Sequence, residues 1–304
     1  MTTIAGHKIK QSVLLKAYKL MCTSARMSKL YDDEKAVCSK YVHSTSRGHE
    51  AIQLAAAMQL LPKDYLAVYY RDESLLLGLG LTPYDLMLQL MAKSDDPFSE
   101  GRAYYVHPAI KKEGFPTIPH QSSATGMQAI PATGMAHGLK YLTSQGLLKG
   151  RSKPIVLCSL GDGSVTEGEV SEAFQMAVLK ELPILYLVQD NDWGISATGS
   201  EMRKMDAYEM AAGFKGMDRL RVDGSDFQES FLVMEQAANL VRRERRPVLV
   251  HAKVPLLGHH TSGVRKEWYR DEENMTLHQK LDPLTKLHQQ LLESGVHQEK
   301  LDKI

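Results

Sequence analysis

The chain has 304 residues, 43% of them hydrophobic, and a formal net charge of +1 at pH 7, which is enough for a substantial core in one large α/β domain. The near-zero charge argues against a nucleic-acid partner held by electrostatics, and no apolar run approaches the roughly 18 residues that would indicate a membrane span. The three cysteines, Cys22, Cys38 and Cys158, are odd in number and show no metal-binding spacing, so we expect reduced thiols in a cytoplasmic protein.

The first predicted element is a helix at residues 12–31, where apolar side chains such as Val13 and Leu14 recur on one side. We expect this N-terminal helical arm to pack against the domain or against another subunit. Residues 46–50 then lead into an alanine-rich helix that ends before Pro62, because proline cannot continue a helix.

A short strand is predicted at residues 66–70, and Arg71 follows its carboxyl end. Arginine can hold phosphate oxygens in a two-pronged fork that lysine cannot reproduce, so Arg71 is a candidate phosphate ligand. The alternative is an ion pair between Arg71 and Asp72 or Glu73.

Two loops come before the next helix. Residues 97–119 carry polar and aromatic side chains that could face a substrate, although we favour a surface arm. These side chains are Arg102, Tyr104, Tyr105 and His107. Residues 120–131 contain small side chains that let the backbone pass close to a ligand.

The centre of the chain predicts a βαβ unit. Residues 155–160 form a short, continuous apolar run typical of a strand buried on both faces, and residues 184–188 form a second one. Between them the apolar residues follow helical spacing, with Ser164 and Thr166 as candidate N-caps. The two strands should therefore be parallel and the crossover right-handed.

A polar residue follows each of these strands, Asp162 after the first and Asn191 after the second. Parallel strands end at the same edge of a sheet, so both side chains can face one point. Carboxylate and amide oxygens suit Mg²⁺, which usually completes its coordination with phosphate and water. The free N–H groups at the start of the predicted helix favour a bound anion. The pattern predicts a magnesium diphosphate site that includes the turn residues Gly161, Gly163 and Ser164.

Two further strands are predicted near residues 219–224 and 247–254, with a helix at residues 226–243 between them. The second leads into a glycine-flanked loop with the adjacent histidines His259 and His260. Histidine can donate to a phosphate or a developing oxyanion and can move protons near neutral pH. A zinc site is the alternative, but no third ligand with suitable spacing lies nearby.

The spacing of GDG and Asn191 is similar to the signature of thiamine-diphosphate enzymes. The string GDGSVTEGEVSEAFQMAVLKELPILYLVQDNDWGIS resembles the alpha subunit of the decarboxylating component of 2-oxo acid dehydrogenase complexes. In that family the Asp and Asn bind Mg²⁺ and a backbone carbonyl two residues later completes the protein ligands, which implies Asp162, Asn191 and Trp193 here. The chain departs from the family at Asp190, where Asn is usual, and at Gln189, where Arg or Glu is common. The second departure implies a weaker charge contact with the diphosphate.

Other motifs extend the resemblance over about residues 12–285. GHEAIQLAAAMQL resembles the family's GQEA helix start. A Tyr-Arg pair that contacts the diphosphate in the family matches Tyr70 and Arg71. A loop whose main chain contacts the aminopyrimidine ring matches the stretch around Ala124 and Gly126.

The sequence GHHT resembles the family's GHH[ST] loop, which contributes a histidine at the reactive end of the cofactor. This implies His260 as the catalytic histidine, also in contact with the cofactor, with His259 as second choice.

The resemblance implies a doubly wound parallel sheet with the thiamine-diphosphate-binding fold, which holds the diphosphate half of the site. We expect residues 1–304 to form a single such α/β domain, with the helical arm at residues 12–31 and a polar helix at residues 283–304. That last helix could be a natural end or a linker cut from a longer fused chain.

The implied function is that of an oxidoreductase subunit that decarboxylates a branched-chain 2-oxo acid on thiamine diphosphate with Mg²⁺ and transfers the acyl group to a lipoyl-bearing acyltransferase. A pyruvate or acetoin dehydrogenase alpha subunit is the alternative. In this family a beta chain supplies the carboxylate for the pyrimidine ring, so we expect activity only with a beta subunit, in an α₂β₂ heterotetramer, or with a fused beta half.

Two other classes of protein fit the sequence less well. A nicotinamide or other nucleotide enzyme could use the same kind of sheet, but no GxGxxG motif follows a strand in this chain. A non-catalytic scaffold subunit could keep the fold without its chemistry, but the retained Asp162, Asn191, Arg71 and His260 argue against it.

Overall fold

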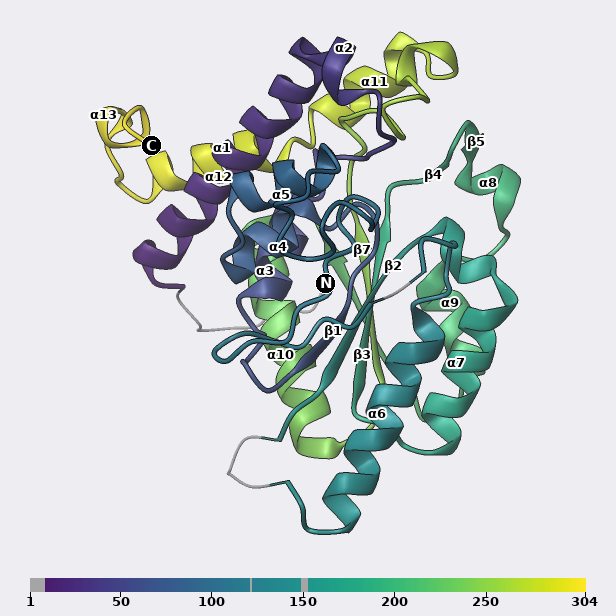
Figure 1. The fold of residues 1–304 in the computed structure, drawn as a ribbon. Coiled ribbons are helices and arrows are strands. Elements are labelled where there is room, and N and C mark those ends of the chain that lie inside the picture. Colours follow the sequence, from purple (N-terminus) through teal and green to yellow (C-terminus); the bar gives the residue numbers. More distant parts are fainter. Residues whose placement is uncertain (1–8, 121, 149–152) are drawn as a thin grey trace.

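A computed structural model describes residues 9–120, 122–148 and 153–304 of the chain (Figure 1). Its centre is a five-stranded sheet in the order β1-β2-β3-β7-β6, and each neighbouring pair of strands is parallel. The strands are β1 (Tyr65–Ala67), β2 (Val156–Gly161), β3 (Ile184–Asp190), β6 (Asp218–Asp223) and β7 (Val248–Lys253). The predicted parallel α/β sheet is therefore confirmed.

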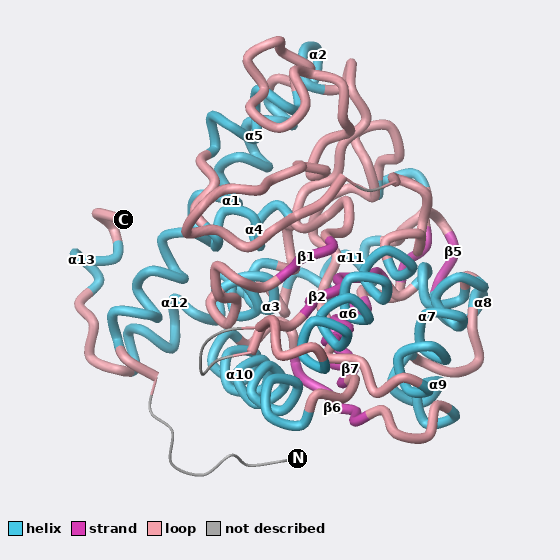
Figure 2. The backbone as a smooth tube through the Cα atoms, turned by 60° about the horizontal axis from the view of Figure 1, so that its bottom comes forward, coloured by secondary structure: helices cyan, strands magenta, loops and turns pink. Residues whose placement is uncertain are grey.

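Helices cover both faces of this sheet (Figures 1 and 2). One face is covered by α3 (Glu50–Ala57), α4 (Glu73–Leu79) and α10 (Phe227–Glu244), and α1 (Gln11–Asp33) packs on α3 and α4 from outside. The other face is covered by α6 (Ala129–Ser144), α7 (Gly168–Leu179) and α9 (Ala207–Met210). Alternate residues of a strand belong to opposite faces: Leu157 and Leu185 join the first core, and Val156 and Tyr186 join the second. The sheet is doubly wound, as predicted.

The remaining elements are short or lie at the periphery. They are α2 (Lys35–Cys38), α5 (Pro83–Leu90), β4 (Trp193–Gly194), β5 (Ala197–Thr198), α8 (Gly199–Met202), α11 (Glu272–Gln279), α12 (Pro283–Glu293), α13 (Gln298–Leu301) and the 3-10 turns η1 (Gly163–Thr166), η2 (Ala211–Gly213) and η3 (Lys266–Trp268). None of the described helices combines the length and the apolar character needed to cross a membrane.

Two predicted boundaries are wrong near the carboxyl edge of the sheet. The first strand was expected at residues 66–70, but β1 ends at Ala67, because the side chain of Asp72 accepts a hydrogen bond from the N–H of Tyr69 and closes a turn. The helix after GDG begins only at α7, behind the 3-10 turn η1. Ser164 and Thr166 do not cap it, since their hydroxyls donate to the carbonyls of Gly161 and Gly163.

The predicted C-terminal helix at residues 283–304 is also wrong as a single element. It is divided into α12 and α13 because Gly295 adopts a left-handed φ of 89°, which ends α12. Helix α12 is amphipathic and buries Leu287 and Leu291 in the core that contains α1. The helix predicted at residues 12–31 is confirmed as α1, and the hydroxyl of Tyr18 in α1 lies 2.8 Å from Nδ1 of His288 in α12.

The βαβ unit at the centre should depend on the side chain of Phe174. This ring in α7 is fully buried, and its centroid lies 4.7 Å from that of Tyr186 and 5.5 Å from that of Phe214. Phe174→Ala should lower the free energy of unfolding by about 3–5 kcal/mol in urea titrations, because the change leaves a cavity.

The matched control on the same helix is Leu179→Ala. The side chain of Leu179 is 67% exposed, so this change should stay within about 0.5 kcal/mol of wild type. Equal effects of the two substitutions would contradict the assigned packing of α7.

Candidate functional site

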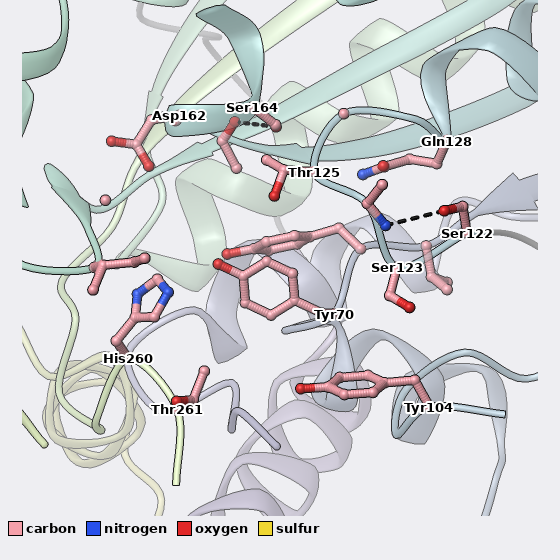
Figure 3. A pocket seen from close by; sticks show the side chains of 18 of the residues that line it. Tyr70, Tyr104, Ser122, Ser123, Thr125, Gln128, Asp162, Ser164, His260 and Thr261 are labelled. Atoms are coloured by element: carbon pink, nitrogen blue, oxygen red, sulfur yellow. Dashed lines mark hydrogen bonds between the residues drawn. The ribbon is translucent and has the colours of Figure 1, made fainter. Parts of the chain in front are cut away.

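A cavity of about 480 Å³ opens at the carboxyl edge of the sheet, beyond the ends of β2 and β3 (Figure 3). It brings together most of the residues that the sequence singled out. These are Tyr70, Ala124, Gly126, Gly161, Asp162, Gly163, Ser164, Asn191, Trp193 and His260. The predicted residues Arg71 and His259 do not line it.

The two candidate metal ligands reach the cavity from neighbouring strands. Gly161 pairs with Gln189 in the register of β2 and β3, so Asp162 and Asn191 leave the sheet at almost the same level. Both side chains are buried. Oδ1 of Asn191 accepts a hydrogen bond from the N–H of Trp193 at 3.0 Å. Since a carbonyl oxygen has two lone pairs, one stays free for a cation.

The charges around these ligands are unevenly distributed. Asp190 lies 2.8 Å from Arg203, His251 and Lys253. Burial alone would raise the pKa of Asp190, but these partners hold it below its usual range. Burial, reinforced by the nearby charge of Asp190, instead raises the pKa of Asp162 to about 7, and Arg203 offsets this only in part.

Asp162 has fewer partners than Asp190. Its Oδ2 forms an ion pair with Arg203 at 2.9 Å but accepts no hydrogen bond. A buried carboxylate oxygen without a hydrogen bond is unfavourable. A divalent cation would satisfy it and would favour the ionised form of Asp162, so the site fits a metal such as Mg²⁺.

Small residues allow two loops to meet beside these ligands. Gly126 has a left-handed φ of 82°, and a Cβ there would lie 3.2 Å from the carbonyl oxygen of Ser164. The loop that contains Ala124 thus packs against turn η1, in which the Ser164 hydroxyl donates to Gly161 at 2.6 Å (Figure 3). Of the predicted loop at residues 120–131, Gln121 lies outside the described residues.

The predicted contact of Arg71 with a diphosphate stays a prediction, and the structure places this residue behind the residues that line the cavity. Arg71 is fully buried and donates to the hydroxyl of Tyr69 and to the backbone carbonyls of Thr45, His259 and His260. The alternative ion pair is wrong, because no carboxylate within the described residues lies within ion-pair distance of this guanidinium. Arg71 therefore acts from behind the cavity wall, where it holds the histidine loop and contributes a buried positive charge.

The two histidines of the loop face different surroundings. His260 lines the cavity, its ring centroid is 6.2 Å from that of Tyr70, and its Nδ1 is buried without a hydrogen-bond partner. Burial and then the charge of Arg71 lower the pKa of His260 to about 3, so the ring is neutral at pH 7. His259 instead accepts a hydrogen bond from the N–H of Lys266 and lies outside the cavity. The structure thus favours His260 over His259 as the histidine that faces a bound ligand.

Neither zinc nor a diphosphate contact from position 189 is supported. Among the described residues, no group of three or more His, Cys, Asp or Glu side chains is arranged to hold a metal ion. The expected weak contact of Gln189 with a diphosphate is wrong, because its amide is fully buried and bonded to Asp72, Ser159 and Gln53.

The preference for a surface arm at residues 97–119 is wrong for three of the four side chains. Tyr105 is buried, and its hydroxyl donates to Oε2 of Glu73. Tyr104 and His107 line the cavity, whereas Arg102 is exposed and pairs with Glu100. The other residues missed from the sequence are mostly neighbours of predicted ones. They include Tyr69, Thr125, Gln128 and Ile195. Their nearness in sequence to Tyr70, Ala124, Gly126 and Trp193 was the available signal.

Comparison with known proteins places the chain among related sequences. The family model described as Dehydrogenase E1 component matches residues 19–304. The alpha 2 subunit of mitochondrial 2-oxoisovalerate dehydrogenase from Arabidopsis thaliana is 28% identical over 264 residues, which cover 86% of this chain and 53% of the relative. The alpha subunit from Caenorhabditis elegans is 29% identical over 282 residues, which cover 92% and 63%.

A pyruvate dehydrogenase E1 component subunit alpha from Rickettsia bellii is also similar. It is 28% identical over 254 residues, which cover 82% of this chain and 72% of the relative. The chain spans less than two thirds of the length of the two 2-oxoisovalerate dehydrogenase subunits.

The raised pKa of Asp162 predicts a pH dependence of stability. The unfolded carboxyl titrates near its ordinary pKa of about 3.9, and the folded one near 7. Between these values the folded protein keeps a proton that the unfolded chain has lost. The free energy of unfolding should therefore fall as pH rises from about 4 to about 7. Asp162→Asn removes this titration, so wild type should lose stability relative to the variant over this range in urea titrations with EDTA.

Asp206→Asn is the control, because hydrogen bonding and nearby cations outweigh burial and lower the pKa of Asp206. Asp206 is then ionised in both states above about pH 4 and should add no trend. Burial raises the pKa of Asp72 to about 6 and that of Glu73 to about 7, but both are unchanged in the comparison. Parallel stability curves for wild type and Asp162→Asn would contradict the assignment.

Proposed function

The chain belongs to the dehydrogenase E1 component family, and we propose that it is the alpha subunit, or the corresponding half of a fused chain, of a 2-oxo acid dehydrogenase. The family implies thiamine diphosphate as cofactor. The observation that carries the proposal is the cavity at the carboxyl edge of the sheet, where Asp162, Asn191 and the GDG turn meet His260.

We propose that Asp162 and Asn191 hold Mg²⁺, with the backbone carbonyl of Trp193 as a third ligand. The buried Oδ2 of Asp162, which accepts no hydrogen bond, supports this assignment. A cation bound there would compete with Arg203, which pairs with Asp162 in the structure. The diphosphate would lie against Gly161, Gly163 and Ser164, next to the metal that neutralises it.

The buried guanidinium of Arg71 supports an anion in this cavity. Its partners are a hydroxyl and carbonyls rather than a carboxylate, and a buried charge without a counter-ion is unfavourable. Its Cζ lies 5.4 Å from the ring centroid of Tyr70, which lines the cavity. A bound diphosphate would bring negative charge toward this cation.

Bound thiamine diphosphate supplies the nucleophilic carbon and the electron sink for decarboxylation of a 2-oxo acid. The residues of this chain bind and orient the cofactor and exchange protons with the bound groups. His260 is neutral at pH 7 and its Nδ1 has no partner in the protein. It can therefore donate a hydrogen bond to an oxygen of a bound group, or accept one, without adding a charge.

A branched-chain 2-oxo acid is the favoured substrate, because the similar chains from Arabidopsis thaliana and Caenorhabditis elegans are subunits of 2-oxoisovalerate dehydrogenase. Pyruvate is the second candidate, favoured by the similarity to the Rickettsia bellii subunit. A lipoyl-bearing acyltransferase as acceptor of the acyl group and a cytoplasmic location are further parts of the proposal.

A beta subunit would complete the site. The five-stranded sheet provides the diphosphate side of the cavity, and the described part of the chain contains no second large sheet for the pyrimidine side. Ile195 lines the cavity and is still 54% exposed, so an apolar part of its mouth is open to a partner. We therefore propose that the cofactor lies at an interface between the two chains.

Metal-dependent cofactor binding should depend on Asp162. Trp193 lines the cavity and the chain has only two tryptophans, so a Trp268→Phe background reports on Trp193 fluorescence alone. With millimolar Mg²⁺, thiamine diphosphate should quench this signal. Asp162→Asn should weaken binding about tenfold or more, since one charged ligand is lost.

Asp192→Asn is the matched control, because Asp192 also lies near Arg203, at 3.6 Å, but does not line the cavity. Its affinity should stay close to that of the background protein. The metal assignment is wrong if Asp162→Asn binds thiamine diphosphate with unchanged affinity and unchanged Mg²⁺ dependence.

The split site predicts that activity needs the partner. The isolated chain should not decarboxylate 3-methyl-2-oxobutanoate or pyruvate, whereas addition of the beta polypeptide should give turnover of one or both and rank them. In the reconstituted pair, His260→Ala should lower activity about 100-fold or more, in keeping with the usual contribution of acid–base groups, with little change in melting temperature.

His259→Ala should affect turnover much less, because His259 lies outside the cavity. The reverse order of the two histidine variants would reverse their assignment. Robust turnover by the isolated chain would refute the shared site.

A further inference from the structure

We propose that His49 and Gln189 are positioning residues that fix the side-chain amide of Asn191 with its oxygen toward the metal. The inference rests on the proposed function, since it takes Asn191 as a metal ligand. Both positioning residues are fully buried and neither lines the cavity. They connect Asn191 to α3 and α4 through a chain of hydrogen bonds in which each donor can be assigned.

This chain of hydrogen bonds starts at Gln53 in α3, whose side-chain amide is oriented by two backbone groups. Its Oε1 accepts from the N–H of Ser74 at 3.2 Å, and its Nε2 donates to the carbonyl of Arg71 at 3.0 Å. A backbone N–H can only donate and a carbonyl can only accept, so the two ends of the Gln53 amide are assigned. The second hydrogen of Nε2 then goes to Oε1 of Gln189, 2.9 Å away.

The amide of Gln189 is assigned by the same logic. Its Nε2 donates to Oδ1 of Asp72 at 2.7 Å and to Oγ of Ser159 at 2.8 Å. Its Oε1 faces Gln53 and also lies 2.8 Å from Nδ1 of His49. Because Oε1 can only accept, Nδ1 of His49 must carry a proton.

The tautomer of His49 agrees with the orientation of Asn191. The N–H of Trp193 can only donate, so the Asn191 atom 3.0 Å from it is Oδ1. The other end of the amide, Nδ2, then donates to Nε2 of His49 at 3.1 Å, so this ring nitrogen is an acceptor. The oxygen of Asn191 is directed the other way, where it accepts from Trp193 and keeps a lone pair free.

Backbone packing holds in place this chain of hydrogen bonds from Gln53 through Gln189 and His49 to Asn191, called the relay below. Gly48 has a left-handed φ of 103°, and a Cβ there would collide with the carbonyl oxygen of Pro255. The start of α3 is thus held against the segment after β7. His49, the residue before α3, lies there beside Asn191. Partners of this kind orient metal ligands in many proteins. Without the relay, only the N–H of Trp193 would oppose a rotation of the Asn191 amide that presents its N–H groups to the cation.

The test is a Mn²⁺ titration of the full chain at millimolar thiamine diphosphate, followed by the electron paramagnetic resonance signal of free Mn²⁺. His49→Leu removes both hydrogen bonds and should weaken Mn²⁺ binding about tenfold or more. His49→Gln can donate to Gln189 and accept from Asn191, so its affinity should stay within about threefold of wild type. If His49 only filled space, His49→Gln would not bind Mn²⁺ more tightly than His49→Leu.

His43→Leu is the matched control, because His43 is also buried but its ring Nδ1 hydrogen-bonds the carbonyl of Tyr41 in its own loop and no group of the metal site. It should bind Mn²⁺ like wild type. Melting temperatures verify the fold of each variant. If His49→Leu does not fold, Gln189→Met removes the acceptor of the Nδ1 proton with little change in size and should also weaken Mn²⁺ binding.

Asp162→Ala, measured in parallel, separates the two levels of the proposal. If it abolishes Mn²⁺ binding while folded His49→Leu and Gln189→Met bind like wild type, the relay is overturned and the metal site stands. A wild-type chain that binds no Mn²⁺ with thiamine diphosphate would overturn the metal site, and the relay with it.

Discussion

Gly161 pairs with Gln189 in the parallel register of β2 and β3, and the chain leaves both strands at the same edge of the sheet. Asp162 and Asn191 meet at one cavity for this reason, although the helix α7 separates them in sequence. A different register of β2 and β3 would separate the two ligands along the strand direction and move Gln189 out of its buried hydrogen bonds. The geometry of the site is therefore a property of the sheet rather than of the loops.

Electrostatics gives this edge its selectivity. Asp190 has three basic partners, which leaves the neighbouring Asp162 short of positive charge and raises its pKa. On the other side of the cavity, Arg71 is buried without a carboxylate and faces Tyr70. One part of the cavity thus favours a cation and the other an anion. A metal diphosphate combines both charges in one ligand, and the family to which the chain belongs implies a diphosphate cofactor.

Local sequence patterns were sufficient to predict what depends on neighbours along the chain. The apolar runs identified the strands, and residues at the ends of these strands line the cavity, as Asp162 and Asn191 do. The role of Arg71 could not be predicted this way, because the carbonyls of His259 and His260, which accept its hydrogen bonds, are far away in sequence. The role of Gln189 could not be predicted either, because its side-chain amide forms hydrogen bonds with three separate elements of the fold.

Turn geometry was the other feature that the sequence did not predict. Ser164 has the composition of a helix cap, yet its hydroxyl bonds Gly161 within a 3-10 turn, and α7 begins four residues later. The division of the C-terminal helix at Gly295 similarly depends on a left-handed φ that composition alone does not require. Glycine permits such a conformation without enforcing it.

A crystal structure of the chain grown with thiamine diphosphate and Mn²⁺ tests the account most directly, because Mn²⁺ can be located by its anomalous scattering. The account predicts one strong peak between the side-chain oxygens of Asp162 and Asn191, next to the diphosphate and about 2.1–2.3 Å from each, the range expected for hard cations with oxygen ligands. A peak elsewhere, or a diphosphate bound away from the GDG turn, would contradict it.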